Sequence, residues 1–126
     1  MRYFVSYARR DNSVARLHRI RALLTDADHV YIDDLEPHAA NIDRSKAVVD
    51  ALTGADAFVA VTSSNYLNTE WTRWEFETAL CMKITMTALL SDTTLVRYGE
   101  ARWPWPGYLA PIGRQPSLPE HPYVSK

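Results

Sequence analysis

The sequence is poor in cysteine and glycine and has no long hydrophobic run. Its single cysteine, Cys81, has no partner for an internal disulfide, and no Cys and His clusters have the spacing of a zinc site. These features fit a reducing compartment, so we expect a cytoplasmic protein without a bound metal. No stretch approaches the roughly 18 apolar residues of a membrane-spanning helix, and the N-terminus lacks the apolar core of a signal peptide. Neither membrane insertion nor secretion is expected.

The chain also lacks an excess of charge of either sign. It has 126 residues with 14 Lys and Arg against 15 Asp and Glu, and a formal net charge of −1. We therefore expect no broad basic surface and predict no nucleic-acid partner. Its length, with 47% hydrophobic residues, suits one globular domain and leaves no room for a second.

Hydrophobic periodicity predicts an α/β fold. Short runs rich in β-branched and aromatic residues indicate strands, and apolar residues spaced three and four apart indicate helices between them. Such alternation predicts a mainly parallel sheet of four or five strands with helices on both faces. The expected strands are 3–7, 29–33, 57–62 and 84–90, and the expected helices are 14–24, one capped by Asp43 or Ser45 and ended by Gly54, and one from Thr69 to Leu80. The fourth strand is ambiguous, because residues 82–86 fit a continuation of the preceding helix equally well.

Residues 103–126 differ in composition from the rest of the chain. They contain six of the seven prolines and two of the four tryptophans. Proline lacks the N–H group that a central strand needs, so we expect an extension that packs on, or trails from, a domain formed by residues 1–102. The two tryptophans favour packing.

Polar side chains follow each of the first three strands. The carboxyl ends of parallel strands form the edge of an open sheet at which ligands bind, so we expect these side chains to converge. Hydroxyl, guanidinium and carboxylate groups together suit a ligand with phosphates and ribose hydroxyls. Because strand ends are polar in most α/β proteins, a purely structural role stays open. The residues are Ser6, Tyr7, Arg9, Arg10, Asp33, Asp34 and Ser63.

The helix that begins at Thr69 places a carboxyl group beside aromatic rings. Glu75 lies four residues after Trp71, so the two side chains share a face. Burial beside an indole would raise the pKa of a glutamate and strengthen its effect on a nearby cation. Periodicity alone favours the alternative, in which the tryptophans are core and the glutamates are solvated. The sequence has no P-loop, no G-x-G-x-x-G and no G-x-S-x-G, so familiar nucleotide-binding and serine hydrolase motifs are absent.

Four segments, in order along the chain, resemble the Toll/interleukin-1 receptor (TIR) domain family. Residues 3–11 resemble its first box, a strand reading F-V-S-Y followed by Arg and Asp. Residues 30–34 are similar to its second strand and the acidic loop that follows. Residues 57–66 resemble its strand leading into S-x-x-Y, and residues 71–75 match its W-x-x-x-E motif.

The resemblance implies a flavodoxin-like fold of three layers and one of two activities. Many TIR domains, especially bacterial and plant ones, cleave the N-glycosidic bond of NAD and release nicotinamide with ADP-ribose or a cyclic form of it, whereas others act only as assembly modules. This chain most resembles the bacterial, NAD-cleaving type. The catalytic residue of the family is the glutamate of W-x-x-x-E, which here is Glu75, and Trp71 would line its pocket. NAD would then be the substrate, with no further cofactor. The expected partners are a second copy of the chain or another TIR protein.

The resemblance also has departures. The last third of the chain matches poorly, and the loop of residues 35–41 contains Pro37 where the family usually has glycine, which predicts a stiffer loop. A nucleoside or nucleotide N-glycosidase, or a deoxyribosyltransferase-like enzyme, is a second interpretation, because related α/β enzymes also place a carboxylate at C1 of the sugar.

Overall fold

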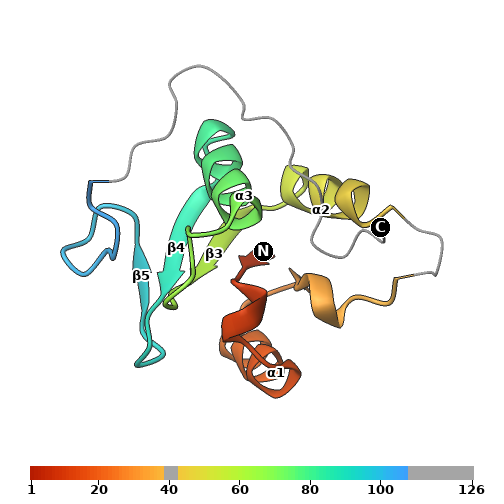
Figure 1. Ribbon diagram of the computed structural model, residues 1–126, viewed down its shortest axis with the longest axis horizontal. Coiled ribbons are helices and arrows are strands. Elements are labelled where there is room, and N and C mark those ends of the chain that lie inside the picture. Colours follow the sequence, from red (N-terminus) through yellow and green to blue (C-terminus); the bar gives the residue numbers. More distant parts are fainter. Residues whose placement is uncertain (39–42, 108–126) are drawn as a thin grey trace.

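The computed structural model describes residues 1–38 and 43–107, in which a five-stranded sheet lies between two layers of helices (Figure 1). The strand order is β2-β1-β3-β4-β5. The elements are β1 (Arg2–Ser6), the 3-10 helix η1 (Arg9–Asp11), α1 (Val14–Leu23), β2 (His29–Tyr31), the 3-10 helix η2 (Asp33–Leu35), α2 (Arg44–Thr53), β3 (Ala57–Val61), α3 (Glu70–Cys81), β4 (Thr85–Leu89) and β5 (Leu95–Arg97). Residues 39–41 of the loop predicted to be stiff and residues 108–126 of the predicted extension lie outside the described residues.

The sheet is mainly parallel, as predicted. β1 pairs in parallel with β2 and β3, and β3 pairs in parallel with β4. β5 runs antiparallel to β4, to which a tight turn connects it. No separate prediction was made for β5, because three residues are too few to show alternating hydrophobicity. The α/β, flavodoxin-like fold expected from the sequence is confirmed.

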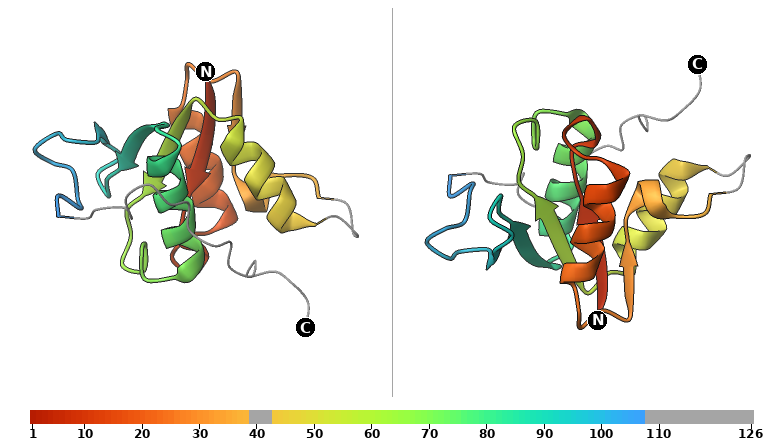
Figure 2. Two further views of the ribbon diagram at one scale, coloured as in Figure 1. Left: turned by 90° about the horizontal axis from the view of Figure 1, so that it is seen from above. Right: turned by 90° about the horizontal axis from the view of Figure 1, so that it is seen from below.

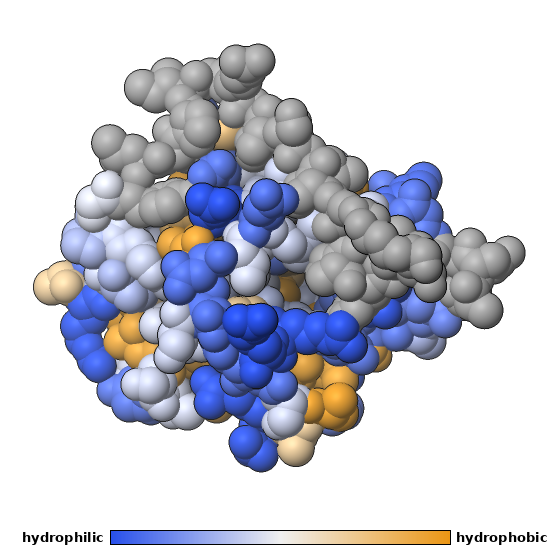
Figure 3. All heavy atoms as spheres, viewed as in Figure 1, coloured by the Kyte–Doolittle hydropathy of each residue, from blue (hydrophilic) through white to orange (hydrophobic). Residues whose placement is uncertain are grey.

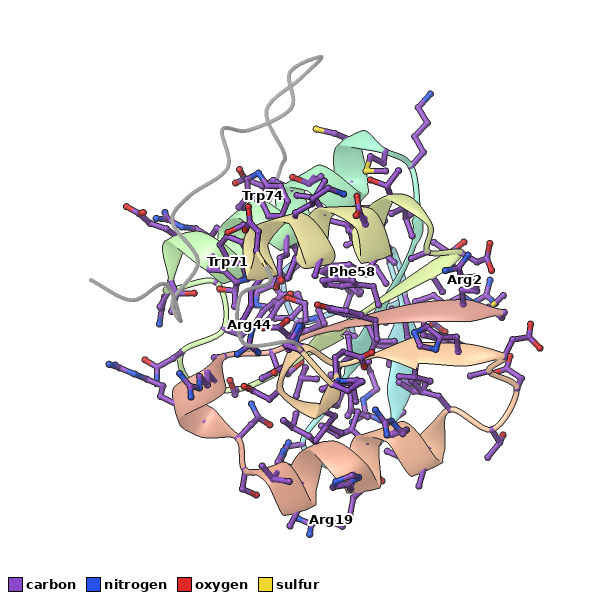
Figure 4. The ribbon with its side chains drawn as sticks, turned by 90° about the vertical axis from the view of Figure 1, so that its right-hand side faces the viewer. Arg2, Arg19, Arg44, Phe58, Trp71 and Trp74 are labelled. Carbon is purple, nitrogen blue, oxygen red and sulfur yellow. The ribbon has the colours of Figure 1, made fainter. Side chains whose placement is uncertain are left out.

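The helices divide between the two faces of the sheet (Figure 2). On one face, α1 packs through Leu17, Ile20 and Leu24 on side chains such as Val5 and Val59 of the central strands. On the other face, α2 and α3 pack on a cluster of aromatic and small residues. This cluster contains Phe4, Tyr31, Phe58, Ala60, Phe76 and Ala88, and Figure 4 shows Phe58 between the sheet and α2.

The helix ends follow the signals in the sequence. Ser13 caps α1, Asp43 caps α2 and Thr69 caps α3, each accepting hydrogen bonds from backbone N–H groups of the first turn. Gly54 is the C-cap of α2. The predicted strand 29–33 is shorter than expected, because Leu35 N–H bonds to Ile32 C=O and draws Asp33 into η2.

The ambiguity after α3 is resolved in favour of a strand. Ile84 N–H donates to Ala79 C=O at 3.1 Å, and Lys83 N–H donates to Leu80 C=O at 3.1 Å. These two bonds form a Schellman motif, which ends the helix with Lys83 in the left-handed region at φ 59°. The chain then leaves the helix axis and enters β4.

The described part of the proline-rich segment packs on the core. Trp103 is 5% exposed, and its ring lies 6.2 Å from that of Phe76 on α3 and 5.2 Å from that of Tyr98. Trp105 lies 5.5 Å from Trp103 and also contacts Phe76.

The described surface is largely hydrophilic in the view of Figure 3, most clearly over the lower middle part, where Figure 1 places α1. The exposed residues of α1 include His18 and Arg19. None of the helices in the described residues is long and apolar enough to span a membrane.

Candidate functional site

Two neighbouring strands send their connections to opposite faces of the sheet. β1 leads into α1 on one face, whereas β3, which pairs with β1, leads into α3 on the other. Such a reversal creates a crevice outside the carboxyl ends of the two strands, where open α/β sheets bind ligands. Figure 4 shows Trp71 and Arg44 toward this end of the sheet, opposite Arg2 at the start of β1.

The carboxyl group of Glu75 is held at this point by two direct donors, one of which is itself held by a third side chain. Its Oε1 atom accepts a hydrogen bond from the hydroxyl of Ser6, the last residue of β1, at 2.7 Å. The Ser6 hydroxyl accepts in turn from the phenol of Tyr66, in the loop after β3, at 2.8 Å. The indole of Trp71, one turn earlier in α3, also hydrogen-bonds the carboxyl group. Side chains from three segments therefore fix one carboxyl group directly or through a neighbour.

Glu75 is buried because of its position on α3. Thr72, Phe76 and Ala79 share the buried side of the helix with Glu75, and Glu75 itself is only 5% exposed. Apolar side chains normally occupy such positions. Loss of water disfavours the charged form, so burial raises the pKa of Glu75 to about 8, aided by the Asp33 carboxylate and opposed by the Ser6 and Trp71 hydrogen bonds. The alternative of a solvated Glu75 is thereby wrong, although Trp74 is core, as that alternative expected.

Within the described residues, none of the groups that shift the pKa of Glu75 is a cation. They are its burial, the two neutral donors and the Asp33 carboxylate. A ligand with a positive charge at this point would favour the ionised form of Glu75 and be stabilised by it.

A second cluster joins the ends of β1 and β2 to the start of α2. Asp34 accepts a hydrogen bond from the phenol of Tyr7 at 2.6 Å. Asp33 accepts from the phenol of Tyr31 at 2.8 Å and from the Arg44 guanidinium at 3.0 Å. Arg44 also lies 3.8 Å from the Asp34 carboxylate, so it bridges the two acids. Burial, together with the Asp33 carboxylate, raises the pKa of Tyr31, so its phenol stays a donor.

The remaining predicted residues lie farther out on the same edge. Arg9 is 3.9 Å from the Asp34 carboxylate and its side chain is 60% exposed, and Arg10 is exposed as well. The Ser63 hydroxyl donates to Asp11 at 2.7 Å, and the side-chain amide of Asn65 does so at 2.7 Å. These hydrogen bonds lower the pKa of Asp11 and connect the loop after β1 to the loop after β3.

The predicted residues thus fall into three groups. Ser6 and Trp71 touch Glu75, whereas Tyr7, Arg9, Asp33 and Asp34 form the neighbouring acidic cluster. Ser63 and Arg10 act on Asp11, in the loop after β1.

The sequence interpretation did not assign a site role to Tyr66, Tyr31, His38 or Arg44. Tyr66 had a detectable signal, because it lies three residues after Ser63 in a loop that leaves a central strand. The sequence held no such signal for Arg44 or for His38. The ring nitrogen of His38 lies 3.2 Å from the Asp33 carboxylate. Arg44 is 11 residues from Asp33 in the sequence, and only the path of the chain into α2 brings them together.

The family model of the TIR domain matches residues 4–112. The chain belongs to the TIR family. No curated protein and no solved structure gives a significant match. TIR domains include NAD-cleaving enzymes and non-catalytic signalling modules, and they commonly associate with one another. In this TIR domain the side chains around Glu75 all lie within the matched residues. Among residues 1–38 and 43–107, no three His, Cys, Asp or Glu side chains are placed to hold a metal ion.

A cavity of about 470 Å³ lies elsewhere on this TIR domain, against α1 and β2. None of the predicted site residues lines it. The lining residues are Arg21, Leu24, Ala27, Asp28, His29, Val30, Leu35, Glu36 and Pro37.

Proposed function

We propose that this TIR domain is an NAD glycohydrolase with Glu75 as its catalytic residue. The observation that carries the proposal is a buried carboxyl group at the switch point of the sheet, held by neutral donors and facing no described cation that shifts its pKa. NAD would bring a positive charge to this point, because its nicotinamide ring is cationic. As the glycosidic bond breaks, the charge moves to the ribosyl group, which an ionised carboxylate stabilises most strongly where water is excluded.

The reaction needs only one carboxyl group. The bond between C1 of the ribose and the ring nitrogen breaks, and its electron pair leaves with nicotinamide, which becomes neutral without taking up a proton. Water adds to C1 and loses a proton, so the products are nicotinamide, ADP-ribose and H⁺. Ordinary glycosidases require a second carboxyl group because their leaving oxygen must be protonated.

The neighbouring cluster supplies groups for the rest of the nucleotide. In this proposal Asp33 and Asp34 accept hydrogen bonds from ribose hydroxyls, and Arg9 and Arg10 bind the phosphates. The exposure of Arg9 leaves its guanidinium accessible to a ligand. We place this activity in the cytoplasm, where NAD is available, with a second copy or another TIR protein as partner.

One observation favours a second candidate, a nucleoside N-glycosidase. The raised pKa of Glu75 leaves it protonated at neutral pH in the free protein. A neutral nucleoside base leaves more readily when it is protonated, and a protonated Glu75 would serve as that acid. The two candidates require opposite protonation states of the same residue, so the pH dependence of the reaction separates them.

The deciding experiment is nicotinamide release from NAD by the purified chain. We expect Glu75→Gln to abolish release while the circular dichroism spectrum is retained, and Glu70→Gln, an exposed glutamate on the same helix, to leave it unchanged. Measurement at low and high protein concentration shows whether subunits complete the site. No release at any concentration would exclude NAD cleavage. Nucleoside cleavage would then support the second candidate, and binding to TIR proteins unaffected by Glu75→Gln would indicate an assembly module.

A further inference from the structure

Tyr66 stands behind the serine that contacts Glu75. Its phenol donates to the Ser6 hydroxyl at 2.8 Å, and the Ser6 hydroxyl donates to Glu75 at 2.7 Å. A hydroxyl has one hydrogen to donate and two lone pairs to accept with. Because Tyr66 occupies a lone pair of Ser6, the single Ser6 hydrogen is directed at the Glu75 carboxyl group. The three side chains therefore form a row of hydrogen bonds with one direction, in which Tyr66 and Ser6 donate and Glu75 is the final acceptor.

The position of the Tyr66 ring is itself strongly determined. Tyr66 is 4% exposed, and its ring lies 5.2 Å from that of Trp105 and 6.4 Å from that of Phe76. The next residue, Leu67, has φ 67°, in the left-handed region that residues other than glycine rarely adopt. Strained backbone of this kind persists where the surroundings hold it, and it concentrates at functional sites.

Within the described residues, few other groups compete with the Tyr66–Ser6 hydrogen bond for control of Glu75. From the sheet, Ser6 donates to it, and Tyr31, at the end of β2, interacts with it electrostatically while its phenol donates to Asp33. Asp33 acts on it as a like charge from η2, and Trp71 donates to it from α3 itself. In an environment with little water, an oriented hydroxyl dipole affects the ionised form more strongly than it does at a surface.

We propose that Tyr66 is a positioning residue that orients the Ser6 hydroxyl and so favours the ionised carboxylate of Glu75. The catalytic meaning of this role rests on the proposed function, in which the ionised form is the active one. The rings of Trp105 and Phe76 pack against the ring of Tyr66 and so keep its hydroxyl group at Ser6. The role is distinct from substrate contact, because the phenol is directed at Ser6 within the protein.

The test substitution, Tyr66→Phe, removes only the phenol oxygen. Two properties of this variant are then measured. The first is titration of the Glu75 carboxyl carbon by ¹³C NMR, assigned by its loss in Glu75→Gln. The second is kcat/KM for NAD against pH. Tyr3→Phe is the matched control, because it removes a phenol bonded to Asp26 at 2.7 Å far from Glu75.

We expect Tyr66→Phe to raise the titration midpoint of Glu75 by about half a pH unit, because the ionised form loses an oriented donor. The same shift lowers kcat/KM about threefold at pH 7 and hardly at all at pH 9, where Glu75 is ionised in both proteins. A merely structural role would lower activity equally at both pH values. Tyr3→Phe should match the unsubstituted protein in both measurements.

A double variant tests whether Tyr66 acts through Ser6. Ser6→Ala should raise the midpoint further than Tyr66→Phe does, and adding Tyr66→Phe to Ser6→Ala should change nothing more. Additive shifts, or an unchanged midpoint in a folded Tyr66→Phe protein, would overturn the proposal. If the unsubstituted protein cleaves no NAD, the proposed function fails, whereas the NMR titration still decides the role of Tyr66.

Discussion

The position of Glu75 reduces the stability of the protein at the pH at which we expect it to work. Its neighbours on the sheet-facing side of α3 are uncharged, and burial raises its pKa to about 8 from an ordinary value of 4.5. An ionised carboxyl group in that place is unfavourable for folding and favourable for a cationic ligand. Functional sites often show this opposition between stability and activity.

The first prediction concerns the pH dependence of catalysis. If the carboxylate is the active form, kcat/KM for NAD rises with pH, nearly tenfold per unit, until it levels near pH 8, because kcat/KM reports the free enzyme. The midpoint for kcat should lie lower, since bound cationic NAD favours ionisation. Initial rates of nicotinamide release between pH 5.5 and 9.5 provide the measurement. A rate that falls as pH rises would instead indicate acid catalysis on a neutral leaving group.

The second prediction concerns stability. The native pKa of Glu75 lies above its unfolded value, so the folded state binds more protons between the two pKa values, and stability declines as pH rises from about 4.5 to 8. Glu75→Gln removes this decline. At pH 8 we expect the variant to be more stable by on the order of 4 kcal/mol, with little of this pH-dependent gain left at pH 4.

Urea unfolding of the two proteins at pH 4, 6 and 8 measures this difference. Glu70→Gln is the control, because that glutamate is exposed at the start of α3 and its substitution should change stability little at any pH. A pH-independent difference between Glu75→Gln and the unsubstituted protein would contradict the raised pKa.

At the scale of elements, the boundary between α3 and β4 depends on one unusual backbone conformation. Lys83 has φ 59° in the Schellman motif that ends α3, a position that glycine usually takes. The side chain of Lys83 is exposed, so its removal costs little packing. The left-handed conformation costs a residue with a Cβ atom roughly 1–2 kcal/mol.

The third prediction follows from this geometry. Lys83→Gly should stabilise the protein by about 1 kcal/mol, because the relief of strain exceeds the extra entropy of glycine in the unfolded chain. Lys83→Ala keeps the Cβ atom and should give no comparable gain. Thermal and urea unfolding of the two variants distinguish the backbone effect from loss of the lysine charge. An equal gain in stability in both variants would mean that removal of the charge, and not relief of backbone strain, stabilises the protein.

At the scale of the whole molecule, the described start of the proline-rich segment contributes to the same core as the sheet. Trp103 is buried against Phe76, and Trp105 reaches Tyr66 beside the site. This packing follows from the five-stranded sheet, since β5 brings the chain back along the α3 side through Val96. Trp103 and Trp105 therefore pack in the core that surrounds the Glu75 site.

The fourth prediction tests that assignment. Trp103→Ala should lower the free energy of unfolding by about 3 kcal/mol, because it removes a large buried side chain. Unfolding should still occur in a single transition, with the same midpoint by tryptophan fluorescence and by circular dichroism. Leu95→Ala, which truncates a side chain that is 40% exposed, should cost much less. Two separate transitions would mean that the segment forms a unit of its own.

Much of this fold followed from local patterns in the sequence. Apolar and aromatic runs predicted β1 and β3. Thr69 and Asp43, the latter one of two candidates, marked the starts of two helices because their side chains bond free backbone N–H groups. The order of these elements was sufficient to predict a mainly parallel sheet. The carboxyl-end rule then located the polar residues, including Ser6 and Asp33, on one edge.

The contacts that define the site were decided by tertiary structure. Periodicity favoured a solvated Glu75, because a helix pattern does not show which face meets the sheet over the end of β1. Ser6 and Glu75 are 69 residues apart, and Tyr66 is 60 residues from Ser6, so their hydrogen bonds depend on the pairing of β1 with β3. The sequence by itself determined which residue types were present and which elements they formed. Only the folded chain determined the burial of Glu75, because removal from water depends on the side chains that surround the carboxyl group in space.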